Sequence, residues 1–131
     1  MQRRIINPWK WQDRFGFVQA NEISGPQRIL ICSGQTSIDA EGHVAHPGDM
    51  GAQVEAALDN LETVLREAGF QFSDIVRLNW YTTDVDLFRR TAEIRAGRLA
   101  KAGCRPASTL LGVSRLAYPE LLVEVEATAA A

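Results

Sequence analysis

Two glutamates near the end of the chain, Glu124 and Glu126, have the type and spacing for acid–base chemistry on one surface. They alternate with apolar residues from Leu121 to Ala127, and this period of two predicts a β-strand whose carboxylates share one face. A carboxylate held beside a substrate can act as a general base or position a water molecule. Carboxylates also lie on solvated sheet surfaces, so two interpretations stay open: a wet sheet face, or a polar pocket that another element closes.

A second polar group, Ser33-Gly34-Gln35, ends the apolar strand predicted from Arg28 to Ser33. Its glycine lets a ligand or another backbone approach closely, and the neighbouring hydroxyl and amide can donate hydrogen bonds. A third strand, predicted from Asp74 to Thr83, also alternates, and its polar face carries Arg77, Asn79, Tyr81 and Thr83. This strand therefore has a polar face of its own, like the strand that carries the two glutamates.

Both histidines, His43 and His46, lie in the polar stretch from Thr36 to Asp49 among acidic residues. Imidazole and carboxylate ligands together suit zinc or iron. The two histidines are three residues apart on a predicted loop, where side chains seldom converge and most histidines are solvated. We therefore expect no metal site.

The elements that position these groups can be read from periodicity and turn residues. A helix is predicted after Asp49, which can cap it, and Gly69 can end it. The predicted elements are, in chain order, a strand from Arg3 to Ile6, a loop with Trp9, Trp11, Phe15 and Phe17, a hairpin formed by Phe17 to Ile23 and Arg28 to Ser33, the helix, the strand from Asp74 to Thr83, a second helix from Val85 to Ala102, and two final strands around the turn at Tyr118-Pro119-Glu120.

This order predicts an α+β fold, a two-layer sandwich in which a mixed β-sheet carries two helices on one face. The other sheet face holds charged groups and apolar residues, Leu110 among them. A face of that composition is suited to burial against further copies of the same chain, where its charges would need partners.

The totals describe an ordinary globular chain with one domain over residues 1–131. Its two cysteines, Cys32 and Cys104, are far apart and form no CxxC pair, so we interpret both as small buried residues. No apolar run is long enough to span a membrane and the N-terminus lacks the apolar core of a secretory signal, which predicts a cytoplasmic protein. The formal net charge of −2 and the absence of a basic stripe argue against a nucleic-acid partner.

Four short motifs resemble signatures of the Rid family, also called the YjgF or reactive-intermediate-deaminase family. They are R-P-A-S-T, G-V-S-R-L-A and V-E-V-E-A in the last quarter of the chain, and S-G-Q near its start. The resemblance implies a chorismate-mutase-like α+β unit that forms homotrimers, with sites for small metabolites in the clefts between subunits and no cofactor.

In the imine-hydrolysing members of this family, an arginine in a P-A-R-S motif binds the substrate carboxylate, for which its forked donors are suited. Alignment on V-S-R-L places that arginine on Ser108, the family's water-positioning glutamate on Glu124, and its pocket tyrosine on Phe17. Arg105 could replace the arginine only if the turn at Pro106 redirects it, because an offset of three residues on a strand reverses the face.

The resemblance leads to a first hypothesis of a cofactor-free hydrolase or deaminase that acts on a small imine- or enamine-type compound. Glu124 would be the general base, Ser33 and Gly34 would supply hydrogen-bond donors, and Ser108 and Thr109 would contact the substrate.

Two alternatives remain. Because the family arginine and tyrosine are replaced, the chain could instead bind a small metabolite without turning it over. The third hypothesis, RNA binding or cleavage, follows from the endoribonuclease names of some relatives and is opposed by the acidic net charge.

Overall fold

The computed structural model describes the whole chain, residues 1–131. Its α-helices and strands are, in chain order, β1 (Gln2–Ile6), β2 (Ala20–Ser24), β3 (Ile29–Ile31), α1 (Met50–Glu67), β4 (Ile75–Thr82), α2 (Val85–Arg89), α3 (Ala92–Lys101), β5 (Ala107–Gly112) and β6 (Val123–Ala130). Two short 3-10 helices, Asp13–Phe15 and Phe72–Asp74, lie in the connections. No helix combines the length and apolar character that crossing a bilayer requires.

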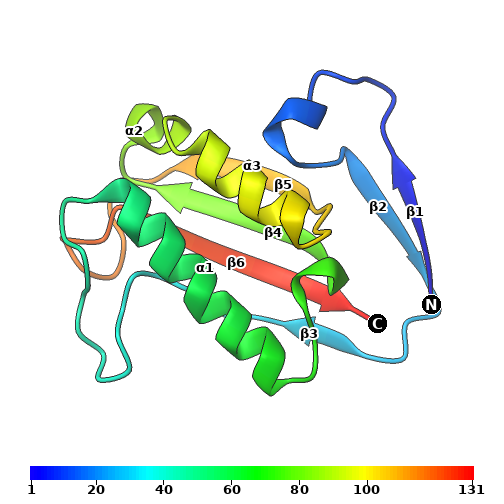
Figure 1. Ribbon diagram of the computed structural model, residues 1–131, viewed down its shortest axis with the longest axis horizontal. Coiled ribbons are helices and arrows are strands. Elements are labelled where there is room, and N and C mark those ends of the chain that lie inside the picture. Colours follow the sequence, from blue (N-terminus) through cyan, green and yellow to red (C-terminus); the bar gives the residue numbers. More distant parts are fainter.

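The main sheet has four strands in the order β3-β6-β4-β5, and Figure 1 shows its helices in front of it. β4 is antiparallel to β6 and parallel to β5, which confirms the predicted mixed sheet and α+β class. The two strands predicted around Tyr118-Pro119-Glu120 are both present. They are not neighbours, because β4 lies between them.

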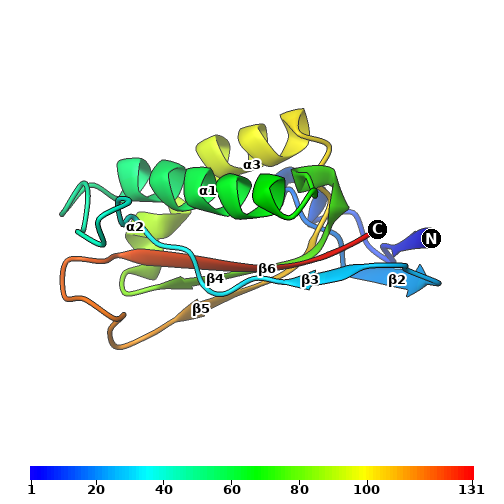
Figure 2. The same ribbon diagram turned by 90° about the horizontal axis from the view of Figure 1, so that it is seen from below.

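The helices lie on one side of the main sheet, as the view along the sheet in Figure 2 shows. The predicted first helix is confirmed: Asp49 Oδ1 accepts a hydrogen bond from the Ala52 N–H at 3.0 Å, and Gly69 follows the helix with a φ of 76°. Leu58, Leu61 and Leu65 of this helix are completely buried against the sheet. Cys32 and Cys104 are both free and buried, as expected.

The predicted second helix is divided into α2 and α3 by Thr91. The N–H and the hydroxyl of Thr91 both donate to the carbonyl oxygen of Phe88, at 3.0 and 2.7 Å. Because that carbonyl accepts from the residue three positions ahead and from a side chain, the i to i+4 ladder is interrupted. The prediction of one continuous helix from Val85 to Ala102 was therefore wrong.

The predicted hairpin of β2 and β3 was also wrong. β2 pairs with β1, while β3 pairs with β6 in the main sheet. Gly25 has a φ of 61° and Pro26 has no N–H to donate, so the chain turns outward between the two strands. The N–H groups of Gln27 and Arg28 then donate to the carbonyl of Ala131, which starts β3 beside the end of β6.

The ribbon of β1 and β2 stands apart from the main sheet and meets it near the beginning of β5 (Figure 1). The guanidinium of Arg3 donates to the carbonyls of Ser73, Ile75 and Arg105 at 3.0, 3.1 and 2.5 Å. A single bridge joins Val18 to Ala107. The strands therefore form two sheets, whereas the sequence predicted a single mixed sheet.

The side of the main sheet that faces away from the helices bears no helix (Figure 2). It exposes apolar side chains at both edges: Ile31 is 79% exposed on β3, and Leu111 is 50% exposed on β5. The prediction that Leu110 belongs to this side was wrong. Leu110 lies opposite the buried Trp80 in the register of β5 and β4, so it faces the helices.

Candidate functional site

The two glutamates lie on the helix-free side of the sheet, together with polar residues of β4. The register pairs Tyr81 with Glu124 and Asn79 with Glu126, and strand alternation points all four side chains to the same side. We call these four residues, with Gly34, the carboxylate face. The predicted polar face is therefore formed by two adjacent strands.

Glu126 is engaged by its neighbours on this face. The Tyr81 hydroxyl donates a short hydrogen bond to Glu126 Oε1, and Asn79 Nδ2 donates to the same oxygen at 3.3 Å. The bond to Glu126 raises the pKa of Tyr81, because the carboxylate holds the phenolic proton. Asn79 Oδ1 is buried and accepts no hydrogen bond, which leaves one polar atom of the face without a partner.

Glu124 differs from Glu126 because its carboxylate accepts no hydrogen bond. It lies against Gly34, where an added Cβ would come within 1.9 Å of Glu124 Oε1. Partial burial, and then the charge of Glu126, raise the pKa of Glu124 above its usual range. A partly desolvated carboxylate without donors has the properties of a proton acceptor.

Two further predicted site residues border this face. Ser33 is exposed, and its carbonyl accepts a hydrogen bond from Gln35 Nε2 at 3.2 Å. Thr109 is exposed on β5, where its hydroxyl oxygen accepts a hydrogen bond from Arg77 Nη2 at 3.0 Å. Arg77 is the one cationic residue that β4 contributes to this side.

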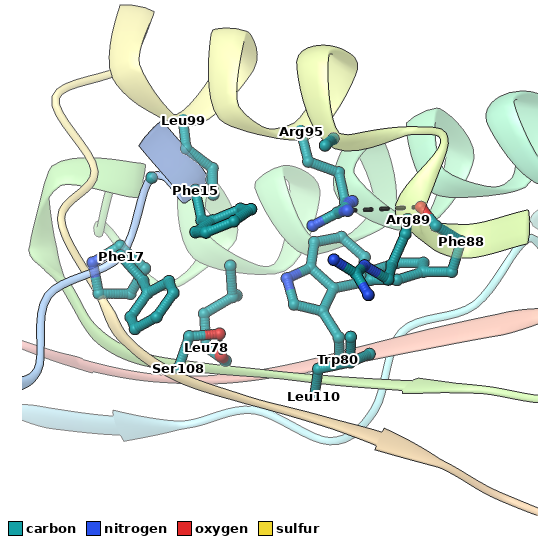
Figure 3. Close-up of a pocket in the computed structure, with 13 residues that line it drawn as sticks. Phe15, Phe17, Leu78, Trp80, Phe88, Arg89, Arg95, Leu99, Ser108 and Leu110 are labelled. Atoms are coloured by element: carbon teal, nitrogen blue, oxygen red, sulfur yellow. Dashed lines mark hydrogen bonds between the residues drawn. The ribbon is translucent and has the colours of Figure 1, made fainter. Parts of the chain in front are cut away.

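Phe17 and Ser108 lie in a different place, a cavity of about 340 Å³ on the helix side of the sheet (Figure 3). The cavity is mostly apolar and lies between α3 and the strands β4 and β5. Ser108 donates its hydroxyl proton to the carbonyl oxygen of Leu78 at 2.5 Å, so this hydroxyl is already used within the sheet. The other residues around the cavity are Phe15, Gly16, Leu78, Trp80, Phe88, Arg89, Ala92, Arg95, Leu99, Pro106 and Leu110.

Arg105 does not line this cavity. It is exposed and lines a separate hollow of about 260 Å³ with Asp13, Val18 and Cys104. Its carbonyl, not its guanidinium, holds the β1–β2 ribbon through bonds from Arg3 and Asn21. The proposed replacement of the family arginine by Arg105 stays a prediction.

The predicted site residues thus fall into two groups separated by the sheet. Gly34 and Glu124 meet on the carboxylate face, whereas Phe17 and Ser108 meet in the helix-side cavity. Ser108 and Thr109 are adjacent residues of one strand and therefore point to opposite sides, a result that alternation alone could have predicted. No single small molecule can contact both groups within one chain.

Sequence reasoning missed Arg95 as a cavity residue. Ala92, Arg95 and Leu99 are spaced by three and four positions, which puts the arginine on the apolar stripe of α3. That spacing was a usable signal for placing Arg95 at the cavity.

The histidine loop contributes nothing to either group. His43 and His46 are exposed, and His43 Nδ1 lies 3.9 Å from Asp39 Oδ2. No cluster of three His, Cys, Asp or Glu side chains has the arrangement to hold a metal ion.

Known proteins resemble this chain in sequence and in fold. The family model described as Endoribonuclease L-PSP matches residues 14–131. A RutC family protein of Pyrococcus horikoshii is 30% identical over 101 residues, which cover 77% of this chain and 78% of that protein. The 2-iminobutanoate/2-iminopropanoate deaminase of Escherichia coli is 30% identical over 103 residues, which cover 77% of this chain and 78% of the deaminase. YyfB of Yersinia pestis, a protein of unknown function of the conserved Rid family, has a crystal structure with a TM-score of 0.88 and 36% identity, and the match covers 100% of both chains.

Proposed function

The chain belongs to the endoribonuclease L-PSP family, also called the Rid or YjgF family, and on this basis we propose that it hydrolyses a small imine or enamine without a cofactor. The observation that carries the proposal is Glu124, a partly desolvated carboxylate that accepts no hydrogen bond and has a raised pKa. The deaminase activity named for the Escherichia coli relative supports the same reaction class.

We propose that the complete site forms between two copies of the chain. Glu124 and Gly34 lie on one side of the sheet, and the cavity with Phe17 and Ser108 lies on the other. A second copy that docks its carboxylate face against the cavity mouth would bring both groups to one ligand. The exposed Ile31 and Leu111 give such contacts an apolar component. A homotrimer, as the family resemblance implies, satisfies this requirement.

The chemistry of Glu124 follows from its position. The substrate enters as the protonated imine. The ionised carboxylate accepts a proton from a water molecule while the water oxygen forms a bond to the imine carbon, and the π electrons of the C=N bond move to nitrogen, which gives a neutral carbinolamine. Glu124 then gives its proton to the amine nitrogen and accepts the proton of the new hydroxyl as the C–N bond breaks and the C=O bond forms. The departing ammonia takes this proton from Glu124 as ammonium, so that protonated imine and water become a carbonyl compound and ammonium. A raised pKa favours both steps, because the carboxylate is a stronger base and its protonated form persists to a higher pH than that of an ordinary glutamate.

A second candidate is a protein that binds a small metabolite without hydrolysing it. The replacement of the family's substrate-binding arginine by Ser108 favours this candidate, since the Ser108 hydroxyl is already bonded to the Leu78 carbonyl. RNA cleavage is not proposed, because the carboxylate face would repel phosphates. The cytoplasmic location stays a prediction.

The test is hydrolysis of a 2-imino acid generated in place by an amino-acid oxidase, followed by the release of ammonia. We expect the wild-type protein to exceed the spontaneous rate and Glu124→Gln to lose about 100-fold or more. Glu67→Gln, an exposed glutamate on α1, is the matched control and should keep full activity.

A wild-type rate equal to the spontaneous rate would refute the proposal for this substrate class. Activity gained by Ser108→Arg alone would then support the binding-protein alternative. Sedimentation should give about three times the chain mass of 14.5 kDa, and a monomer would contradict the shared site.

A further inference from the structure

The guanidinium of Arg95 lies over the aromatic wall that Phe88 and Trp80 form in the helix-side cavity (Figure 3). Its Cζ lies 3.9 Å from the centroid of the Phe88 ring and 5.7 Å from that of Trp80. Nε donates to Thr91 Oγ1 at 3.0 Å, and Nη2 donates to the Phe88 carbonyl at 3.3 Å. The side chain is therefore fixed in place and aimed into the cavity.

No carboxylate of the chain pairs with Arg95. Arg98, one turn further along the same helix, shows the usual arrangement: it forms ion pairs with Glu55, Asp59 and Glu62 of α1 at 3.2, 2.7 and 3.3 Å. Burial lowers the pKa of Arg95 to about 10, since nothing nearby compensates for the lost hydration. A partly buried guanidinium without a counter-ion lowers the stability of the fold, and a bound anion would remove this penalty.

The remaining donors of Arg95 are suited to such an anion. A guanidinium has five N–H groups, and two of them are used, which leaves three, including both on Nη1. Arg89, at the same cavity, adds a second cation. The volume of about 340 Å³ accommodates one small molecule, and the aromatic walls favour an apolar body.

We propose that this cavity binds a small carboxylic acid with an aromatic or branched apolar body, and that Arg95 pairs with its carboxylate. The apolar part lies between Phe17, Trp80 and Leu110. This binding does not require the protein to be catalytic. A further step rests on the proposed function: the bound acid is the substrate, and Arg95 binds its carboxylate in place of the family arginine that Ser108 replaces.

Calorimetric titration with phenylacetate tests the proposal, and phenylacetamide serves as the uncharged probe of the same shape. We expect phenylacetate to bind the wild-type protein at least about 10-fold more tightly than the amide, since one charge-assisted pair contributes about 1.5–3 kcal/mol. Arg95→Gln should remove this preference, Arg95→Lys should retain part of it, and Arg90→Gln, an exposed neighbour outside the cavity, should change nothing.

A second variant distinguishes a blocked cavity from a loss of binding caused by unfolding. Leu110 is 39% exposed at the cavity and makes none of the bonds that hold Arg95, so Leu110→Trp should fill the cavity and abolish binding with an unchanged melting temperature. Equal affinity for the acid and the amide, or no binding of either at millimolar concentration, would overturn the proposal.

The two proposals fail separately. Selective binding of phenylacetate by a protein that hydrolyses no imine would refute only the catalytic function. Hydrolysis that depends on Glu124 but not on Arg95 would refute only the assignment of the substrate carboxylate to this cavity.

Discussion

The two sides of the main sheet contrast sharply although the same strands build both. On the helix side, Leu78, Val123 and Val125 are completely buried and belong to one apolar core. On the other side, Glu124 lies beside a second carboxylate, and Asn79 Oδ1 is buried without a hydrogen bond. The helix side thus stabilises the fold, whereas the carboxylate face holds two like charges and an unpaired polar atom, which are unfavourable for stability. Such unfavourable groups are typical of functional sites.

The largest expected effect is on the helix side. Leu61→Ala removes a completely buried side chain of α1 and should lower the free energy of unfolding by about 2–5 kcal/mol. Urea unfolding followed by circular dichroism measures this. A loss below about 1 kcal/mol, the scale of a surface substitution, would mean that Leu61 is not part of the stabilising core.

A smaller effect is expected on the carboxylate face. Tyr81→Phe removes the hydrogen bond to Glu126 and should cost about 1–2 kcal/mol, because Asn79 still donates to the same oxygen. The same urea titration gives the value. If this variant lost as much stability as Leu61→Ala, the carboxylate face would stabilise the fold as strongly as the apolar core does, and the two sides of the sheet would not differ in this respect.

The smallest expected effect is a gain in stability and not a loss. The pKa of Glu124 is raised in the folded protein, so the folded state binds more protons than the unfolded state as pH rises above about 4.5, and stability falls until pH exceeds the folded pKa. Glu124→Gln removes this loss and should raise the melting temperature at pH 7 by a few degrees. At pH 4 the two proteins should melt at nearly the same temperature, and a lower melting temperature for the variant at pH 7 would contradict the raised pKa.

Much of this architecture follows from the sequence. The helix from Asp49 to Gly69 and the alternating faces of β4 are decided by local periodicity and caps, which the sequence displays directly. The break at Thr91 was not predictable from periodicity, because it depends on a side-chain hydroxyl competing for the Phe88 carbonyl.

The candidate site was harder to predict. The sequence identified Glu124 and Gly34 through short motifs, and the structure places them in contact. It could not reveal that Arg95 lies over an aromatic wall, because helical spacing gives the direction of a side chain and not the depth of the space it enters. The missing counter-ion of Arg95 is likewise a property of the folded chain.

The attachment of the β1–β2 ribbon has a consequence for how the protein opens in solution. Its two strands pair only with each other, and Arg3, Asn21 and the single bridge at Val18 connect them to the main sheet. Local unfolding proceeds in cooperative units, and a unit with few connections opens at lower free energy than the whole molecule. Backbone amides of β1 and β2 should therefore exchange with deuterium well before those of β4 and β6.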